Sequence, residues 1–172
     1  MRTRIACMNA VLIALAIATG VAASTPAGIS IGAPDSAKWT ATTLEAATAE
    51  ANKKVLASGA AATVTGEVVD VSCYLQLGKR GEAHVACGSK CIEHGQPIGL
   101  LDSSEKLYIL FAEEHHPRRD GQVDLKKVLA PHLAKTVTVS GMMTEMKGYS
   151  ALFVRIVDLA GEVKPAKERI RY

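Results

Sequence analysis

Five short segments rich in β-branched and other apolar residues constrain the fold of this chain most strongly. Glycine and polar turn residues separate them, which is typical of strands. A short helical pattern lies between the third and fourth segments, where Leu125, Val128 and Leu129 recur at helical spacing before Pro131. The predicted strands are 62–73, 97–102, 107–111, 136–141 and 150–157, and the predicted helix is 124–130. The sequence therefore predicts a mainly β domain with three strands before the helix and two after it.

This order of elements resembles the OB fold, a five-stranded barrel with its helix between strands three and four. The resemblance covers residues 66–159 and implies a small barrel. Gly66, inside the first predicted strand, indicates the bend or bulge that such a barrel needs. We expect a five-stranded OB-like barrel with a Cys/His-bearing helical insert between strands 1 and 2. A short helix between strands 3 and 4 and an N-terminal helix from about 35 to 58 complete the predicted fold.

The N-terminus has the pattern of a secretory signal peptide. Arg2 and Arg4 form a positively charged start, an apolar run follows over 8–18, and small residues precede Ser24. We expect cleavage after Ala23, which makes the mature protein periplasmic or secreted and leaves no stable membrane anchor. A retained anchor is the alternative, but the apolar run is shorter than the roughly 20 residues that a spanning helix needs.

Composition divides the rest of the chain and limits its partners. The expected parts are a signal peptide (1–23), a flexible leader with the N-terminal helix (24–58), the barrel domain (59–161) and a charged tail (162–172). Loss of Arg2 and Arg4 lowers the formal net charge from +3 to about +1, and aromatic residues make up only 4% of the chain. Neither the charge nor the supply of stacking side chains indicates a nucleic-acid partner.

The mature chain keeps three cysteines, because Cys7 leaves with the signal peptide. An odd number of thiols in an oxidising compartment requires an explanation. Either one disulfide forms and leaves one thiol free, or the thiols share a metal ion. A disulfide from Cys73 to Cys87 or Cys91 would tether the insert to the barrel and contribute roughly 3 kcal/mol.

Histidines cluster with these cysteines. His84, Cys87, Cys91 and His94 recur at offsets of three, four and three, which places them on one face of a helix. His84 and His94 would lie about 15 Å apart along that helix, so only one of them can bind a given ion. We therefore predict a metal site made by Cys73, Cys87 and Cys91 with either His84 or His94.

Copper and zinc are the metals that this ligand set favours. Three thiolates with one imidazole suit zinc or a cluster, and fewer thiolates with imidazole suit copper. The Cys87-x3-Cys91 spacing resembles that of copper-chaperone proteins used in oxidase assembly, which favours copper over structural zinc. Met142, Met143 and Met146 would add thioether ligands if their loop faced the site, although packing is their commoner role.

A more specific resemblance rests on four motifs. They are Gly66-Glu67-Val68-Val69-Asp70, Cys73-Tyr74, His84-x2-Cys87-x3-Cys91 and Gly95-x-Pro97-x-Gly99. Together they resemble a group of uncharacterised exported bacterial proteins, which implies the compartment and a barrel with a Cys/His insert but no activity. Asp70 is expected to be a structural hydrogen-bonding residue, with support of a ligating histidine as the alternative.

No nucleophile elbow, phosphate loop, haem-attachment motif or His-Glu-x-x-His pattern occurs in the sequence, so we do not expect an enzyme. The leading hypothesis is a periplasmic protein that binds a transition metal, copper before structural zinc. The alternative is a disulfide-stapled OB-like module that binds a protein or another cell-envelope partner.

Overall fold

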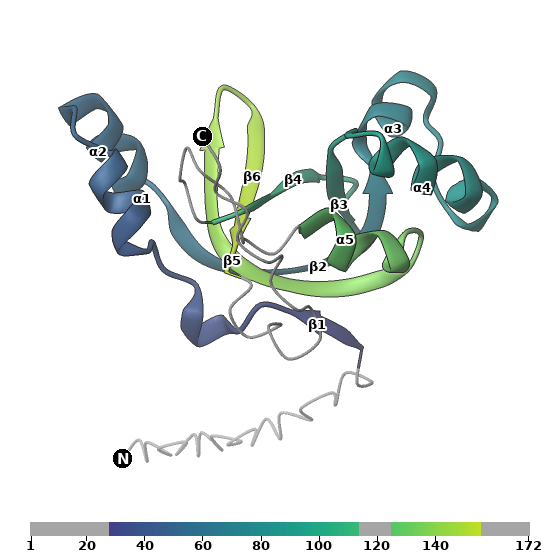
Figure 1. The fold of residues 1–172 in the computed structure, drawn as a ribbon, viewed down its shortest axis with the longest axis horizontal. Helices are drawn as coiled ribbons and strands as arrows, with labels where there is room; N and C mark the ends of the chain where they lie inside the picture. Colours follow the sequence, from purple (N-terminus) through teal and green to yellow (C-terminus); the bar gives the residue numbers. More distant parts are fainter. Residues whose placement is uncertain (1–27, 114–124, 156–172) are drawn as a thin grey trace, which may run out of the picture.

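The computed structural model describes residues 28–113 and 125–155, which form six strands and several short helices (Figure 1). The strands are β1 (Ile29–Ile31), β2 (Ala60–Asp70), β3 (Ile98–Asp102), β4 (Leu107–Ala112), β5 (Thr136–Met146) and β6 (Tyr149–Val154). The α-helices are α1 (Ala41–Ala46), α2 (Glu50–Ala57), α3 (Val71–Leu77), α4 (Val85–Glu93) and α5 (Leu125–Leu129). The 3-10 helices are η1 (Pro34–Ser36), η2 (Glu82–His84) and η3 (Ala130–His132). The expected signal peptide (1–23) and charged tail (162–172) lie outside the described residues.

Five of these strands close into a barrel. They follow the order β5-β2-β3-β4-β6, and β6 pairs back onto β5. Strands β4 and β6 are parallel, and the other pairings around the barrel are antiparallel. Helix α5 lies between β4 and β5 in the chain, which is between the third and fourth strands of the barrel. The predicted OB-like barrel is therefore confirmed.

Strand β2 links the two halves of the barrel because it pairs with β5 along its first part and with β3 along its second. Gly66 lies where these pairings overlap, opposite both Val137 and Asp102. A Cβ atom at this position would collide with the carbonyl oxygen of Leu101. Glycine therefore permits the close approach of β2 to β3, as expected from its place inside the predicted strand.

One hydrophobic core joins the barrel to its helices. Val68, Leu100 and Leu152 from three barrel strands are completely buried. Leu129 of α5 and Ile92 of α4 belong to the same cluster. Because Ile92 is anchored in this core, α4 is fixed to the barrel, and the Cys/His insert has a defined position.

The boundary of the first predicted strand was wrong at its C-terminal end. The strand ends at Asp70 and not at Cys73, because the Asp70 side chain caps a helix that begins at Val71. Cys73 therefore lies in helix α3. The position of Cys73 relative to the other cysteines therefore depends on how helix α3 packs.

The N-terminal part also differs from prediction. The single helix expected over 35–58 is divided into η1, α1 and α2, and α2 buries no side chain. Strand β1 lies inside the expected leader and pairs in parallel with residues 137–139 of β5. Ile31 explains this pairing, because it is 2% exposed and belongs to the barrel core.

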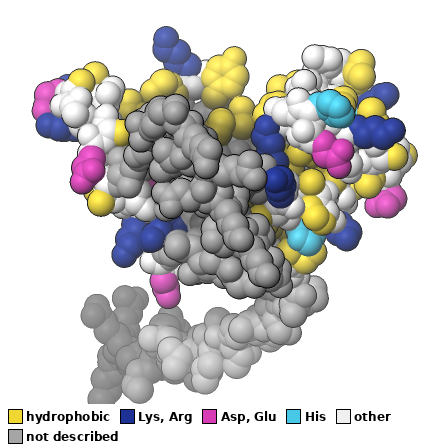
Figure 2. Space-filling view, viewed as in Figure 1, with side chains coloured by type: hydrophobic (Ala, Val, Ile, Leu, Met, Phe, Trp, Pro, Cys, Tyr) yellow, Lys and Arg dark blue, Asp and Glu magenta, His cyan; other side chains and the backbone are white. Residues whose placement is uncertain are grey.

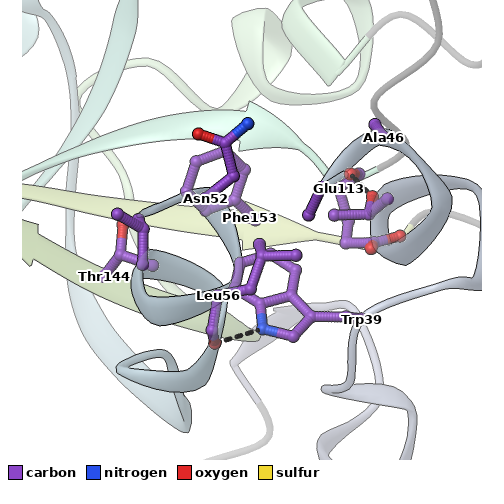
Figure 3. A pocket seen from close by; sticks show the side chains of 10 residues that line it. Trp39, Ala46, Asn52, Leu56, Glu113, Thr144 and Phe153 are labelled. Carbon is purple, nitrogen blue, oxygen red and sulfur yellow. Dashed lines mark hydrogen bonds between the residues drawn. The ribbon is translucent and has the colours of Figure 1, made fainter. Parts of the chain in front are cut away.

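Helices α1 and α2 rest on the end of the barrel opposite to α3 and α4 (Figure 1). A pocket of about 290 Å³ lies beside them, with Trp39, Leu56 and Phe153 in its walls (Figure 3). The Trp39 ring packs edge-on against Phe153 at 5.5 Å between centroids, and its Nε1 donates to the carbonyl oxygen of Leu56 at 2.9 Å. The buried Glu113 carboxylate accepts a hydrogen bond from the backbone nitrogen of Thr40 at 2.7 Å. These contacts hold the N-terminal segment to the barrel.

Candidate metal centre

Helices α3 and α4 form a lobe at the C-terminal end of β2 (Figure 1). Gly78 ends α3 in the left-handed conformation with φ 65°, and Gly95 follows α4 with φ 103°. Figure 2 shows histidine, charged and hydrophobic side chains mixed on the surface of this lobe. Leu75 and Leu77 of α3 are among its exposed apolar residues. The lobe is thus a helical insert between the first and second barrel strands, as the sequence predicts.

Asp70 sets the direction in which the chain leaves the barrel. Its Oδ1 atom accepts hydrogen bonds from the backbone nitrogens of Ser72 at 3.0 Å and Cys73 at 3.2 Å. These bonds satisfy two of the free N–H groups that begin helix α3. The chain therefore turns into a helix directly after β2, and Cys73 is carried towards α4.

Two overlapping sets of donor atoms lie at helices α3 and α4, and Cys73 belongs to both. The Sγ atoms of Cys73 and Cys91 are 3.9 Å apart. Donor atoms of Cys73, His84 and Cys87 lie within 4.8 Å of one another, and so do those of Asp70, Cys73 and Cys91. Thiolates and imidazoles are ligands of soft and borderline metals. The group can therefore hold a metal ion.

His84 and Asp70, which belong to these two donor sets, form a buried pair. Asp70 is completely buried and His84 is 6% exposed, and the His84 Nε2 atom lies 3.8 Å from the Asp70 Oδ2 atom. Neither atom has a hydrogen-bond partner among the described residues. A buried polar group without a partner costs about 1–3 kcal/mol. A cation bound at this position would remove part of that cost.

Gly88 provides the space that His84 occupies. A Cβ atom at residue 88 would lie 2.7 Å from Cδ2 of Leu133 and 3.2 Å from Nε2 of His84. Both contacts are tighter than ordinary packing, so a larger residue here would require the side chains of Leu133 and His84 to shift. The residue next to Cys87 thus helps to position the imidazole.

The three thiols are free in this structure. The 3.9 Å between the sulfurs of Cys73 and Cys91 is far longer than a disulfide bond of about 2.05 Å. Hydrogen bonding to Asp70, together with burial, raises the pKa of Cys73 to about 12. Burial also raises the pKa of Cys91. Cys87 is exposed, so the group is open to solvent on the Cys87 side.

The structure brings His84, and not His94, to the cysteines. His94 follows the last residue of α4 and is exposed, and its Nδ1 atom is 2.7 Å from the carbonyl oxygen of Lys90. Neither of the two sets of converging donors contains His94. Of the two histidines that the sequence left open, His84 is therefore the one placed to bind.

The methionines lie elsewhere. Met142 and Met143 pair with Ala61 and Ala60, at the opposite end of the 11-residue strand β2 from Asp70. Met142 is buried, in agreement with a packing role. Thioether ligation by these residues is therefore not supported.

The part played by Asp70 was predicted only in outline. The sequence assigns it mainly a structural role, and the cap on α3 confirms that role. The structure adds that its second carboxylate oxygen faces His84 and that it lies beside Cys73 and Cys91. An aspartate directly after the strand-forming pair Val68 and Val69 is the sequence signal that indicates this cap.

The fold and the site define an OB-like barrel whose first connection carries a Cys/His group able to hold a metal ion. Comparison with protein-family models, curated proteins and solved structures gives no match to this chain. Among the described helices, none has the length and apolar character required to cross a membrane.

Proposed function

We propose that this protein binds a transition metal ion, preferably Cu(I), through Cys73, His84, Cys87 and Cys91, and that it does so in the periplasm. The proposal rests on the close approach of the Cys73 and Cys87 thiols to the buried His84 imidazole, and of the Cys91 thiol to that of Cys73. Among the described residues, Nε2 of that imidazole has no hydrogen-bond partner. A metal ion matches both the softness of the donors and the unmet bonding capacity of His84.

Donor type and geometry favour Cu(I) over Zn(II). Structural zinc binds four donors at the corners of a tetrahedron, where sulfurs bound at about 2.3 Å lie about 3.8 Å apart. The pair Cys73 and Cys91 fits this spacing. The donors of the described residues nevertheless form two sets of three, and Cu(I) is satisfied by few soft ligands. Structural zinc is therefore the second choice.

Metal handling, rather than catalysis, is the role that we propose. The signal-like N-terminus supports a periplasmic location. Asp70 and His84 are buried, whereas Cys87 is exposed. A bound ion would therefore contact buried side chains on one side and remain accessible to solvent on the Cys87 side. This arrangement suits an ion that is exchanged with an envelope partner.

Competition titration tests the proposal. Reduced mature protein would be titrated without oxygen against a chromophoric Cu(I) chelator, and separately with Zn(II) against a zinc chelator. We expect the wild type to withdraw Cu(I) from the chelator and Cys73→Ser and His84→Asn to lose most of this capacity. His94→Asn is the matched control, because it changes a histidine at the end of the same helix that lies outside both donor sets. Failure of the wild type to compete for either metal would refute the proposal, and competition for zinc alone would reassign the site.

A disulfide-stapled binding module is the second candidate, and the neighbouring sulfurs of Cys73 and Cys91 favour it. A bridge between them would join α3 to α4 and contribute roughly 3 kcal/mol. Intact-mass measurement after alkylation without reductant separates the two functions. Protein from the periplasm with one modified thiol would support the bridge, and three modified thiols would exclude it.

A further inference from the structure

The two donor sets have one member in common. The first set contains Cys73, His84 and Cys87, and the second contains Asp70, Cys73 and Cys91. Within each set the donor atoms lie no more than 4.8 Å apart. Donors bound to one ion at about 2.3 Å are separated by at most about 4.6 Å, so each set is within reach of its own ion after a small adjustment. The Sγ atom of Cys73 is therefore within reach of both ions.

From this sharing we infer that the site holds two Cu(I) ions bridged by the Cys73 thiolate. The inference rests on the proposed copper-binding function and extends it to the composition of the cluster. One ion is bound by Cys73, His84 and Cys87. The other is bound by the thiolates of Cys73 and Cys91, with the Asp70 carboxylate beside it as a hard and therefore weaker donor.

The chemistry of loading needs no redox partner. The S–H bonds of Cys73, Cys87 and Cys91 break and three protons pass to solvent. Cys73 then forms two copper–sulfur bonds, Cys87 and Cys91 form one each, and His84 donates a nitrogen lone pair. Both ions enter and remain as Cu(I). Three thiolates against two positive charges leave one negative charge on the copper–sulfur unit, and the Asp70 carboxylate beside the second ion brings the total to two.

The two positions differ in their access to solvent. Cys87 is exposed, whereas Cys91 is half-buried and Asp70 is completely buried. The ion on the Cys87 side is therefore the one that a chelator or a partner protein reaches first. Withdrawal of copper would occur in two phases, the first of which removes one ion per chain.

Copper stoichiometry and X-ray absorption test the inference. Mature protein loaded with excess Cu(I) without oxygen and then desalted should contain two copper ions per chain as a monomer in size-exclusion chromatography. The absorption spectrum should show a copper–copper scattering shell. Cys87→Ser and Cys91→Ser should each retain one ion and lose that shell, Cys73→Ser should lose both ions, and the control His94→Asn should keep two.

Each other outcome decides against the cluster. One copper ion in the wild-type monomer, two ions without a copper–copper shell, or two ions only in a dimer would overturn it while leaving copper binding intact. Absence of bound copper in the wild type would instead refute the proposed function itself. Because the absorption spectrum is recorded on the wild type, a variant that fails to fold does not remove the test.

Discussion

The carboxylate of Asp70 serves two neighbours at once, because its Oδ1 atom caps helix α3 while its Oδ2 atom lies 3.8 Å from Nε2 of His84. The cap directs the helix that carries Cys73. The second oxygen lies near the imidazole that is grouped with the thiols of Cys73 and Cys87. The buried Asp70 side chain, at the end of the first barrel strand, thus contacts both the helix that carries Cys73 and the imidazole of His84.

Separate substitutions of Asp70 should distinguish its cap from its charge. In metal-free protein, Asp70→Ala should lower the free energy of unfolding by about 0.5–2 kcal/mol, because it removes the cap. Asp70→Asn should cost less, since its amide oxygen still accepts from the nitrogens of Ser72 and Cys73. Urea unfolding followed by circular dichroism measures both values. Equal losses in the two variants would show that the charge, and not the cap, stabilises this region.

The thiols should react with alkylating reagents at different rates. Cys87 should be modified first because it is exposed, and Cys73 should be modified slowly at pH 8 because its pKa is raised to about 12. The thiolate is the reactive form, so the rate at Cys73 should continue to rise with pH well above the ordinary thiol value of 9.0. Asp70→Asn should shift this profile to lower pH, because the hydrogen bond to the Asp70 carboxylate is the largest cause of the raised pKa. Peptide mapping after timed iodoacetamide treatment gives these rates, and an unshifted profile in Asp70→Asn would contradict the assignment.

Substitution of Gly88 should disturb the site without changing any donor. Gly88→Ala gains up to about 1 kcal/mol of helix propensity. It also forces a Cβ atom against Leu133 and His84, and overpacking of this kind costs about 1–3 kcal/mol. We expect no net gain in stability and a loss of Cu(I) affinity of about 10-fold or more, because the imidazole is displaced. Ser89→Ala, on the same helix, is the control and should leave affinity unchanged.

Asp102 should make the turn between β3 and β4 sensitive to acid. Hydrogen bonds, above all from the side chain of Ser104, lower the pKa of Asp102 in the folded protein below its ordinary value of 3.8. A carboxyl group whose pKa falls on folding stabilises the protein above its unfolded pKa, and this contribution is lost as the pH falls towards the folded pKa. Asp102→Asn should therefore lower the melting temperature at neutral pH, with a difference from wild type that shrinks below about pH 4. Thermal unfolding over a pH series, with the exposed Glu93→Gln as control, measures this, and a difference independent of pH would contradict it.

Glu113 should hold the N-terminal segment to the barrel. Glu113→Ala removes an acceptor of the backbone nitrogen and hydroxyl of Thr40, and hydrogen bonds to a charged group contribute about 1.5–3 kcal/mol each. Trp39 is the only tryptophan in the chain and packs beside this contact, so its emission should shift to longer wavelength while the β-type circular dichroism remains. Glu45→Ala, on the exposed side of α1, should leave the emission unchanged. An unchanged spectrum in Glu113→Ala would show that other contacts dock the segment.

The barrel could be predicted because the patterns that specify its strands lie within short stretches of the sequence. Short apolar segments separated by turns, with one helical segment after the third, specify the number and order of the strands. Gly66 could be interpreted in advance, because a glycine inside a strand usually marks a close backbone approach. Strand β1 was missed because three residues with one buried side chain, Ile31, give too short a pattern, and their pairing depends on β5 far away in the sequence.

The candidate ligands could be chosen from residue type and spacing, and the structure places Cys73, His84, Cys87 and Cys91 in groups that could hold a metal ion. The helical offsets between His84 and His94 indicated a shared face and, through the rise of the helix, limited the site to one of the two histidines. That argument could not choose between them. The choice depends on α4 packing against the barrel through Gly88 and Ile92, which buries His84 and leaves His94 at the exposed end of the helix.

By itself, therefore, the sequence determined the class of fold and the types of candidate ligand, because periodicity and side-chain chemistry are properties of neighbouring residues. The tertiary structure alone decided which ligands meet. Cys73 and Cys91 are 18 residues apart in the chain, and their sulfurs are brought to 3.9 Å only because Asp70 starts a helix where a strand was expected. Such a contact depends on the packing of α3 and α4 on one barrel, and no local pattern records it.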